Sequence, residues 1–397
     1  MKTAVLYCEY GSRASYYDDW RDAFVNAPAF DTTTFNIAVG GPREDFMRRV
    51  GEFDLIAMLH SVNADHLLYA NMIVGALQSR KGKLFSFVGN EVNLPGAPMA
   101  PKIDYLTRIN ADVVGTQLLA EAGAFLYAGT GARAAAVPHA LNPEAFRPGP
   151  LDNRPIDIGL RSFRYPSVFL GDDDRNRLID HFQRHGENMD LTLDLSTESR
   201  MDRAEWAAFL NASKATISNE AGGYWIERDD ATLNAITAWL KARRSGGITI
   251  SSNSWLRRLA HMLPWSMRQA LVKRLKSGLI RHESLIGDEK DFEEVRRLFF
   301  DTKPFPPEVS GKCISSRHFD AIGTMTCQIM IEGRYNDILQ ADEHYIPVKV
   351  DLSNIHDAVA RMRDETERKA MVRRTHEYVL AEHTHAHRMT RIAELVA

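Results

Sequence analysis

Cysteine is scarce in this chain of 397 residues, and its three copies, Cys8, Cys313 and Cys327, lie far apart. Their spacing matches neither a disulfide framework nor a zinc site, so we expect reduced thiols in a cytoplasmic protein. No apolar run approaches the ~20 residues that a membrane-spanning helix needs. The chain passes from Met1 and Lys2 directly into an apolar strand pattern, so no signal peptide is expected.

The sequence also lacks a clear metal- or cofactor-binding signature, although two patterns come close to one. The Asp-x-Asp pattern of Asp172 to Asp174 precedes a predicted helix, so we interpret it as a cluster at a helix N-terminus. His383 and His387 have i, i+4 spacing, but no carboxylate supplies a third ligand. We therefore expect no metal and no cofactor besides the substrates.

Acidic residues are absent from residues 231–282, which hold ten Lys or Arg, although the whole chain has a net charge of only −3. The balance of the whole chain does not require nucleic acid as a partner. Within the basic segment, Trp and Leu alternate with Arg and Lys, a pattern typical of contact with an anionic membrane surface through 250–281. Two alternatives stay open: binding of an anionic glycan or partner subunit, and simple packing of an inserted helical pair.

The length suits two domains of roughly 150–200 residues each. Short apolar runs alternate with helical patterns through both halves, which predicts an α/β fold with two doubly wound parallel sheets. Prolines between 138 and 155 mark a linker. We predict a first domain over 1–150, a second domain over 151–380 with a basic helical insertion at 231–290, and a final helix over 381–397.

The most informative stretch runs from Gly311 to Val350 and combines a polar turn, a short helix and two strands. A helix start after a turn presents free N–H groups to a phosphate. Arg317 offers a bidentate phosphate contact. Asp320 lies one helical turn later on the same face and offers a carboxylate to the hydroxyls of a ribose.

This stretch resembles the C-terminal donor-binding motif of the GT-B-fold glycosyltransferases known as "glycosyl transferases group 1" (family-4-like). The family pattern R-x-F-E-A-x-A-x-G stands here as RHFDAIGTM at 317–325, and EHTHAHRM at 382–389 resembles the family's closing helix. The resemblance covers residues 310–397 well and 1–220 loosely. Two positions depart from the pattern: Asp320 replaces a Glu, and Lys312 stands where many retaining members have a second Glu.

The resemblance implies a GT-B fold, with an acceptor-side domain over 1–150, a donor domain over 151–380 and a closing helix over 381–397 that crosses back to the first domain. It also implies transfer of a hexose-type sugar from a nucleotide-activated donor to a glycan or lipid-linked hydroxyl acceptor, without a metal. It places the protein in cell-surface glycan assembly, in the cytoplasm or peripherally on the inner face of the membrane. Neutralisation of the diphosphate is assigned to Arg161 or Lys312. The donor contacts are predicted at Gly311, Lys312, Ser315, Ser316, Arg317, Asp320, Arg164 and Glu220.

Loops that follow strands of the first domain should line the acceptor side of the cleft. There, Gly11 and Ser12 follow the first strand and Asn90 follows the fourth. An inverting enzyme needs a general base near the attacking hydroxyl, and His60 or Glu91 is the candidate, with Glu91 expected to be exposed. A retaining enzyme needs no such base, because the leaving phosphate takes the proton.

Two other classes of protein stay open at this point. One is a GT-B-fold enzyme that is not a transferase, such as a nucleotide-sugar epimerase. The other is a non-catalytic scaffold in a glycan-assembly complex, suggested by the replaced acids at 312 and 320. The donor sugar, the base, the acceptor, the stereochemical outcome and the oligomeric state do not follow from the sequence.

Overall fold

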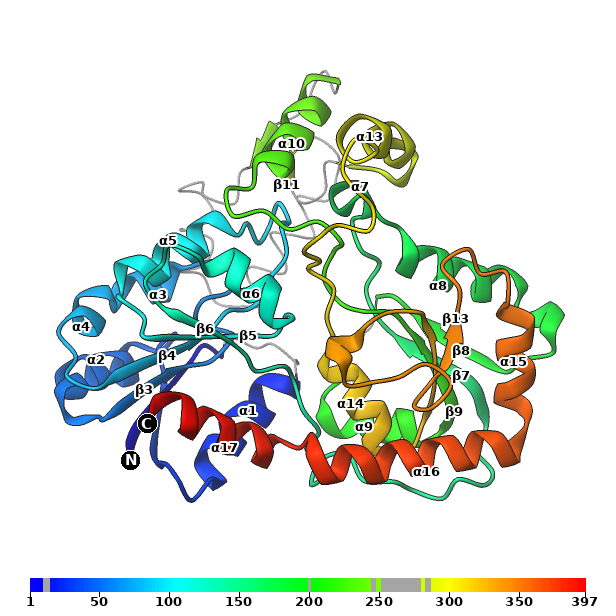
Figure 1. Ribbon diagram of the computed structural model, residues 1–397, viewed down its shortest axis with the longest axis horizontal. Coiled ribbons are helices and arrows are strands. Elements are labelled where there is room, and N and C mark those ends of the chain that lie inside the picture. The colour runs from blue at the N-terminus through cyan, green and yellow to red at the C-terminus, as the bar shows by residue number, and fades with distance from the viewer. Residues whose placement is uncertain (10–14, 199–200, 244–247, 251–279, 283–286) are drawn as a thin grey trace.

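The computed structural model describes residues 1–9, 15–198, 201–243, 248–250, 280–282 and 287–397. Two lobes stand side by side, and each is built around a parallel sheet with helices on its faces (Figure 1). The α/β architecture predicted from the alternating pattern is thereby confirmed. The linker connects the two sheets between residues 136 and 156.

The first lobe contains a six-stranded parallel sheet in the order β2-β1-β3-β4-β5-β6. Its strands are β1 (Lys2–Tyr7), β2 (Asp31–Asn36), β3 (Leu55–Met58), β4 (Lys83–Phe87), β5 (Val113–Thr116) and β6 (Arg133–Ala136). Its helices are α1 (Ser15–Asn26), α2 (Gly40–Arg49), η1 (Val50–Glu52), α3 (Leu68–Met72), α4 (Val74–Gln78), α5 (Ala100–Arg108) and α6 (Ala120–Tyr127). Strand β3 is buried along its whole length, as expected for a strand that helices cover on both faces.

The second lobe contains a five-stranded parallel sheet in the order β13-β12-β9-β7-β8. Its strands are β7 (Ile156–Arg161), β8 (Leu193–Ser196), β9 (Ser213–Ser218), β12 (Cys327–Ile331) and β13 (Ile346–Val348). Its helices are α7 (Ser167–Leu170), α8 (Asp174–His185), η2 (Glu187–Met189), α9 (Arg203–Asn211), α14 (Ser316–Gly323), η5 (Tyr335–Asp337), α15 (Ile355–Arg363) and α16 (Glu365–Glu382). The carboxyl ends of β7, β9 and β12 therefore lie at one edge of the sheet, where a ligand crevice is expected.

The described part of the predicted insertion at 231–290 lies above the two lobes in Figure 1. Its described elements, with the helix that follows, are α10 (Ala231–Arg243), a parallel pair of β10 (Ile248–Ile250) and β11 (Ile280–His282), η4 (Glu289–Asp291) and α13 (Phe292–Phe299). Apolar side chains of α10, α7 and α13 form one small core. The predicted membrane-contact segment lies outside the described residues over 251–279, so that prediction stays untested.

The last helix, α17 (His385–Val396), leaves the second lobe and packs against α1 of the first (Figure 1). Met389 and Ile392 share a buried core with Trp20 and Phe24. The two chain ends consequently lie close together in the first lobe.

The apolar spacing of residues 64–78 predicts one long helix, and the structure shows that this prediction is wrong. The chain forms two short helices instead, α3 and α4, which Ile73 separates. Asn63 and Asp65 favour a turn directly after β3. Gly75 further weakens a continuous helix, because glycine loses more backbone freedom than other residues.

The loop after β9 fastens the two lobes together at Asp230. Its buried carboxylate accepts hydrogen bonds from the backbone N–H groups of Met99 at 3.0 Å and Ala100 at 2.8 Å. Asn93 donates to the same carboxylate at 2.6 Å. Asp230 therefore caps the N-terminus of α5 from the opposite lobe, and this contact helps to set the width of the space between the lobes.

Candidate active site

A small cavity of about 20 Å³ lies at the carboxyl ends of β7 and β9. Its charged lining consists of Arg161, Arg175 and Arg317, and Asn219 lies beside them. No carboxylate lines it in the part of the chain that the structure describes. Three cationic side chains at the crevice edge of an α/β sheet make this the candidate anion site.

Two of these arginines were predicted, and the structure brings them to one place. Arg161, the last residue of β7, donates to Asp194 Oδ2 at 2.8 Å and packs 4.0 Å over the ring of Phe209. Arg317, in the first turn of α14, donates through Nη1 to Ser162 Oγ at 2.8 Å. Both guanidinium groups are thus held at the cavity by neighbouring side chains.

Arg175 and Asn219, which the sequence analysis missed, complete the cavity. Arg175 is buried in the first turn of α8, lies 3.8 Å over the ring of Tyr165 and donates through Nε to Asn219 Oδ1 at 2.9 Å. Its Nη1 atom and Asn219 Nδ2 are buried, and neither has an acceptor among the described residues. A buried donor without an acceptor costs about 1–3 kcal/mol, so these atoms mark the place where an acceptor-rich ligand would be held.

The cavity is too small in this structure for a complete phosphate group, because a single water already needs about 10–15 Å³. Arginine side chains are long and have several rotatable bonds. A ligand would therefore enter by displacing guanidinium ends rather than by deforming the sheet.

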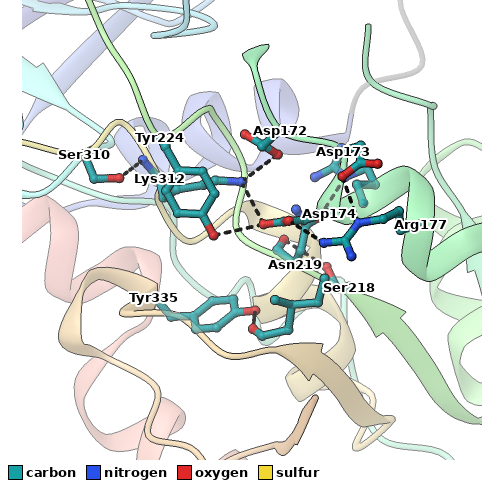
Figure 2. Close-up of polar contacts among 12 residues, drawn as sticks. Asp172, Asp173, Asp174, Arg177, Ser218, Asn219, Tyr224, Ser310, Lys312 and Tyr335 are labelled. Atoms are coloured by element: carbon teal, nitrogen blue, oxygen red, sulfur yellow. Dashed lines mark hydrogen bonds and ion pairs between the residues drawn. The ribbon is translucent and has the colours of Figure 1, made fainter. Parts of the chain in front are cut away.

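Lys312, the other residue predicted to neutralise a diphosphate, lies in a buried ion-pair cluster (Figure 2). Its Nζ atom is 3.3 Å from Asp172 Oδ1, 3.8 Å from Asp174 Oδ2 and 4.3 Å from the centre of the Tyr224 ring. Burial raises the pKa of Asp172, and the ammonium of Lys312 opposes that rise. Lys312 therefore compensates two carboxylates of its own lobe and does not line the arginine cavity.

Asp320, the predicted ribose ligand, is only 3% exposed and accepts a hydrogen bond from Trp206 Nε1 at 2.9 Å. Burial raises its pKa well above the ordinary value of an aspartate. Trp206 itself lines the arginine cavity, so Asp320 stands behind that wall. Its burial and the hydrogen bond from Trp206 give the predicted ribose contact no support in this packing.

Glu220 and Gly311, two predicted donor contacts, lie in tightly packed loops of the second lobe. Glu220 Oε1 accepts the N–H of Tyr335 at 2.7 Å, and a Cβ on Gly333 would stand 2.4 Å from its other oxygen. Burial raises the pKa of Glu220. A Cβ on Gly311 would stand 2.1 Å from Ile226 Cγ2, so no larger side chain fits there. The predicted donor contact at either residue gains no support from this packing.

The remaining predicted donor residues occupy different surroundings. Ser315 is the N-cap of α14, and its backbone N–H donates to His318 Nδ1 at 2.9 Å. Ser316 is half-buried in the first turn. Arg164 points away from the cavity lining and pairs with Asp180 at 2.6 Å. Among these three, the serines lie on the same helix as Arg317, and Arg164 belongs to a separate ion-pair network.

Both predicted acceptor-side bases are buried. His60 has no exposed surface and stacks on Phe87 with ring centroids 4.2 Å apart, and burial lowers its pKa well below the ordinary value. Glu91 accepts hydrogen bonds from Thr116 Oγ1 at 2.7 Å and from the Tyr127 hydroxyl at 2.5 Å. The prediction that Glu91 is exposed is therefore wrong, and burial raises its pKa.

Asp65, on the acceptor side, is an exposed acid that the sequence analysis did not single out. Gly11 and Ser12 lie outside the described residues, whereas Asn90 is exposed and donates to Asp65 Oδ1 at 2.5 Å. Asp65 is itself exposed in the loop after β3. Its position after a strand was visible in the sequence, but the predicted helix over 64–78 concealed it.

Neither a metal site nor a membrane span is found in the described ranges. No three His, Cys, Asp or Glu side chains there are placed to hold a metal ion. None of the helices described is both long and apolar enough to cross a membrane.

Residues 248–394 match the family described as "Glycosyl transferase-like". Sucrose-phosphate synthase from Thermosynechococcus elongatus has a similar structure, with 12% identity, 100% of this chain and 98% of that chain covered, and a TM-score of 0.50. HepE from Anabaena, solved with UDP-glucose, has 10% identity and a TM-score of 0.49, and the alignment covers 99% of this chain and 98% of that chain. None of the curated proteins matches the sequence significantly. The predicted resemblance to GT-B glycosyltransferases is thereby confirmed.

Proposed function

We propose that this chain, whose residues 248–394 match a glycosyl transferase-like family and whose fold is GT-B, transfers a sugar from a nucleotide-activated donor to a hydroxyl acceptor. The observation that carries the proposal is the arginine cavity with its two buried donors, Arg175 Nη1 and Asn219 Nδ2. A phosphate presents several acceptor oxygens and a negative charge, so it satisfies both donors and pairs with the guanidinium groups. We assign the cavity to the diphosphate of the donor.

We propose that the same groups allow the reaction to proceed without a metal. When the bond between the sugar and the diphosphate breaks, negative charge develops on the leaving phosphate. Arg161, Arg175 and Arg317 stabilise that charge in the role that a divalent cation has in phosphoryl transfer. EDTA should therefore leave the transfer rate unchanged. A loss of activity that Mg²⁺ or Mn²⁺ restores would refute the metal-free mechanism.

On the acceptor side, we propose that Asp65 replaces His60 and Glu91 as the candidate base. Asp65 is exposed and bonded to Asn90, whereas the other two side chains are buried within the first lobe. An inverting reaction would need this carboxylate to take the proton from the attacking hydroxyl. The Asp65→Asn variant should then lose activity at saturating donor. Unchanged activity would assign the proton to the leaving phosphate instead.

For the cellular role, we propose glycan assembly at the cytoplasmic face of a membrane. The acid-free composition of residues 231–282 supports this, since each basic residue near an anionic surface contributes about 1 kcal/mol. Deletion of residues 251–279 should reduce sedimentation of the protein with phosphatidylserine vesicles and leave its sedimentation with neutral vesicles unchanged. Equal sedimentation of both forms with anionic vesicles would remove the membrane contact.

A thermal-shift screen against UDP, GDP, ADP, CMP and TDP with their sugars tests the proposed function. A ligand at a hundredfold excess over its dissociation constant stabilises the folded protein by about 2.7 kcal/mol. A selective response followed by acceptor-dependent release of the nucleotide supports the transferase. Consumption of the donor without an acceptor would indicate an epimerase or hydrolase, and absence of any response would indicate a scaffold.

A further inference from the structure

A second and larger cavity, of about 650 Å³, opens on the other side of the first turn of α8. Its volume lies in the range of small-molecule sites, about 300–1,000 Å³. Neighbouring residues of α8 face the two cavities: Asp174 lines the larger one and Arg175 lines the arginine cavity. A ligand in the larger cavity would therefore lie about one helix diameter, ~10–12 Å, from the proposed phosphate position.

One wall of the larger cavity is aromatic. Phe305 is 62% exposed, which is unusual for so large an apolar side chain. Its ring lies 5.0 Å from that of Tyr224 and 5.9 Å from that of Trp225. Trp225 is fixed in turn, because its Nε1 donates to the carbonyl of Pro304 at 3.3 Å. These rings form a fixed apolar surface of the kind on which the C–H face of a pyranose packs.

The part of the lining next to these rings is polar, and one of its acceptor atoms has no hydrogen-bond donor among the described residues. Asp172 and Asp174 point toward Lys312, and the Tyr224 hydroxyl donates to Asp174 Oδ2 at 2.9 Å (Figure 2). Asp172 Oδ2 is buried, and no donor for it exists among the residues with described positions. The side chain of Asp172 is only 9% exposed. A hydroxyl group that enters the cavity would supply the missing hydrogen bond.

The charge of this cavity distinguishes it from the arginine cavity. Six carboxylates and three cationic side chains line it, so a phosphate or another anion would meet net repulsion. Arg177 pairs with Asp173 at 2.8 Å and with Asp174 at 3.2 Å and so offsets part of the negative charge. A neutral ligand with many hydroxyl groups suits both the carboxylates and the aromatic wall.

We propose that the larger cavity binds a neutral pyranose segment of the acceptor glycan. The inference rests on the proposed transferase function and adds an acceptor subsite on the second lobe, beside the donor. The acceptor chain then packs a sugar ring on Phe305 and Trp225 and donates a hydroxyl to Asp172. Its growing end reaches past the first turn of α8 toward the donor.

Titration with maltotriose, cellotriose and chitotriose, followed by ligand-observed NMR, tests the proposal. A sulfated oligosaccharide serves as the anionic probe. At least one neutral trisaccharide should bind, and Phe305→Ala should weaken its binding about fivefold. As the control, Leu380→Ala removes a 38% exposed apolar side chain from α16, outside the lining of this cavity, and should leave saccharide binding unchanged. In transfer assays, Phe305→Ala should raise the KM for the acceptor and leave the KM for the donor unchanged.

Three results would overturn the inference: no neutral trisaccharide binds at millimolar concentration, Phe305→Ala binds as the wild type does, or the sulfated probe binds most tightly. Titration of the same samples with the nucleotide separates this inference from the proposed function. Nucleotide binding without saccharide binding refutes the acceptor subsite alone. Saccharide binding that depends on Phe305 without nucleotide binding supports the sugar site and refutes the donor proposal.

Discussion

Replacement of Lys312 by methionine should destabilise the protein strongly, because it leaves buried carboxylates without their cation. Lys312 is 4% exposed, and its Nζ lies within 4 Å of both Asp172 and Asp174. Removal of one partner from a buried ion pair costs about 3–5 kcal/mol. Asp174 keeps its bonds to Tyr224 and Arg177. Asp172 loses the donor that the structure shows for it, so we expect a loss near the lower limit, about 3 kcal/mol.

The pH dependence of this loss follows from the direction of the pKa shift. Burial already raises the pKa of Asp172, and removal of the Lys312 ammonium raises it further. A carboxyl whose pKa is raised in the folded state binds a proton more readily there than in the unfolded chain. The variant therefore loses stability as the pH rises through that raised pKa. The deficit relative to the wild type should be smaller at acidic pH than at alkaline pH.

Urea denaturation followed by circular dichroism measures both effects. Lys290→Met is the matched control, since Lys290 is 79% exposed and pairs loosely with Asp288 at 3.8 Å. Its free energy of unfolding should change by no more than about 0.5 kcal/mol. The addition of Asp172→Asn to Lys312→Met should restore part of the lost stability. A free energy of unfolding within about 1 kcal/mol of the wild type for Lys312→Met at alkaline pH would show that the reasoning fails.

Arg175→Gln should weaken binding of a nucleoside diphosphate about 10–100-fold in calorimetric titration, because a charged hydrogen bond contributes about 1.5–3 kcal/mol. The control Arg164→Gln should leave the dissociation constant unchanged. Glu91→Gln should lower the free energy of unfolding by about 1–3 kcal/mol and leave the donor KM unchanged; loss of turnover without loss of stability would restore Glu91 as the base. Burial lowers the pKa of His139 and of His385 to about 3. Between about pH 6.5 and pH 3, these two side chains are therefore protonated in the unfolded chain and neutral in the folded chain. Stability should fall as the pH is lowered through that window, and His385→Asn should flatten the dependence of Tm on pH; an unchanged slope contradicts this.

Much of the fold follows directly from local pattern. From the sequence pattern alone we predict helices over 174–185, 203–211 and about 385–396, and these bounds agree with α8, α9 and α17. Alternating apolar strands and amphipathic helices carry their own signal, because each must bury one face against its neighbours. The incorrect prediction of one helix over 64–78 shows where local pattern is insufficient. The apolar spacing continues through this stretch, but a turn precedes α3 and the backbone leaves the helix at Ile73, between α3 and α4.

The site was less predictable, because burial of polar side chains depends on partners distant in the sequence. Glu91 reads as an exposed acid after a strand, yet Tyr127 and Thr116 satisfy it inside the lobe. The position of Asp320 near a helix start suggests a ligand contact, but in the structure its carboxylate accepts a hydrogen bond from Trp206 Nε1. Arg175 directly follows three aspartates and reads as part of a capping cluster, and only its packing in the structure directs it into the cavity.

The structure of a complex with the nucleoside diphosphate selected by the screen tests the central claim most directly. A phosphate oxygen should lie within hydrogen-bonding distance of both Arg175 Nη1 and Asn219 Nδ2, with Arg161 and Arg317 turned toward the same group. A diphosphate bound in the larger cavity beside Asp172 and Phe305, or bound away from the second lobe, would contradict the account.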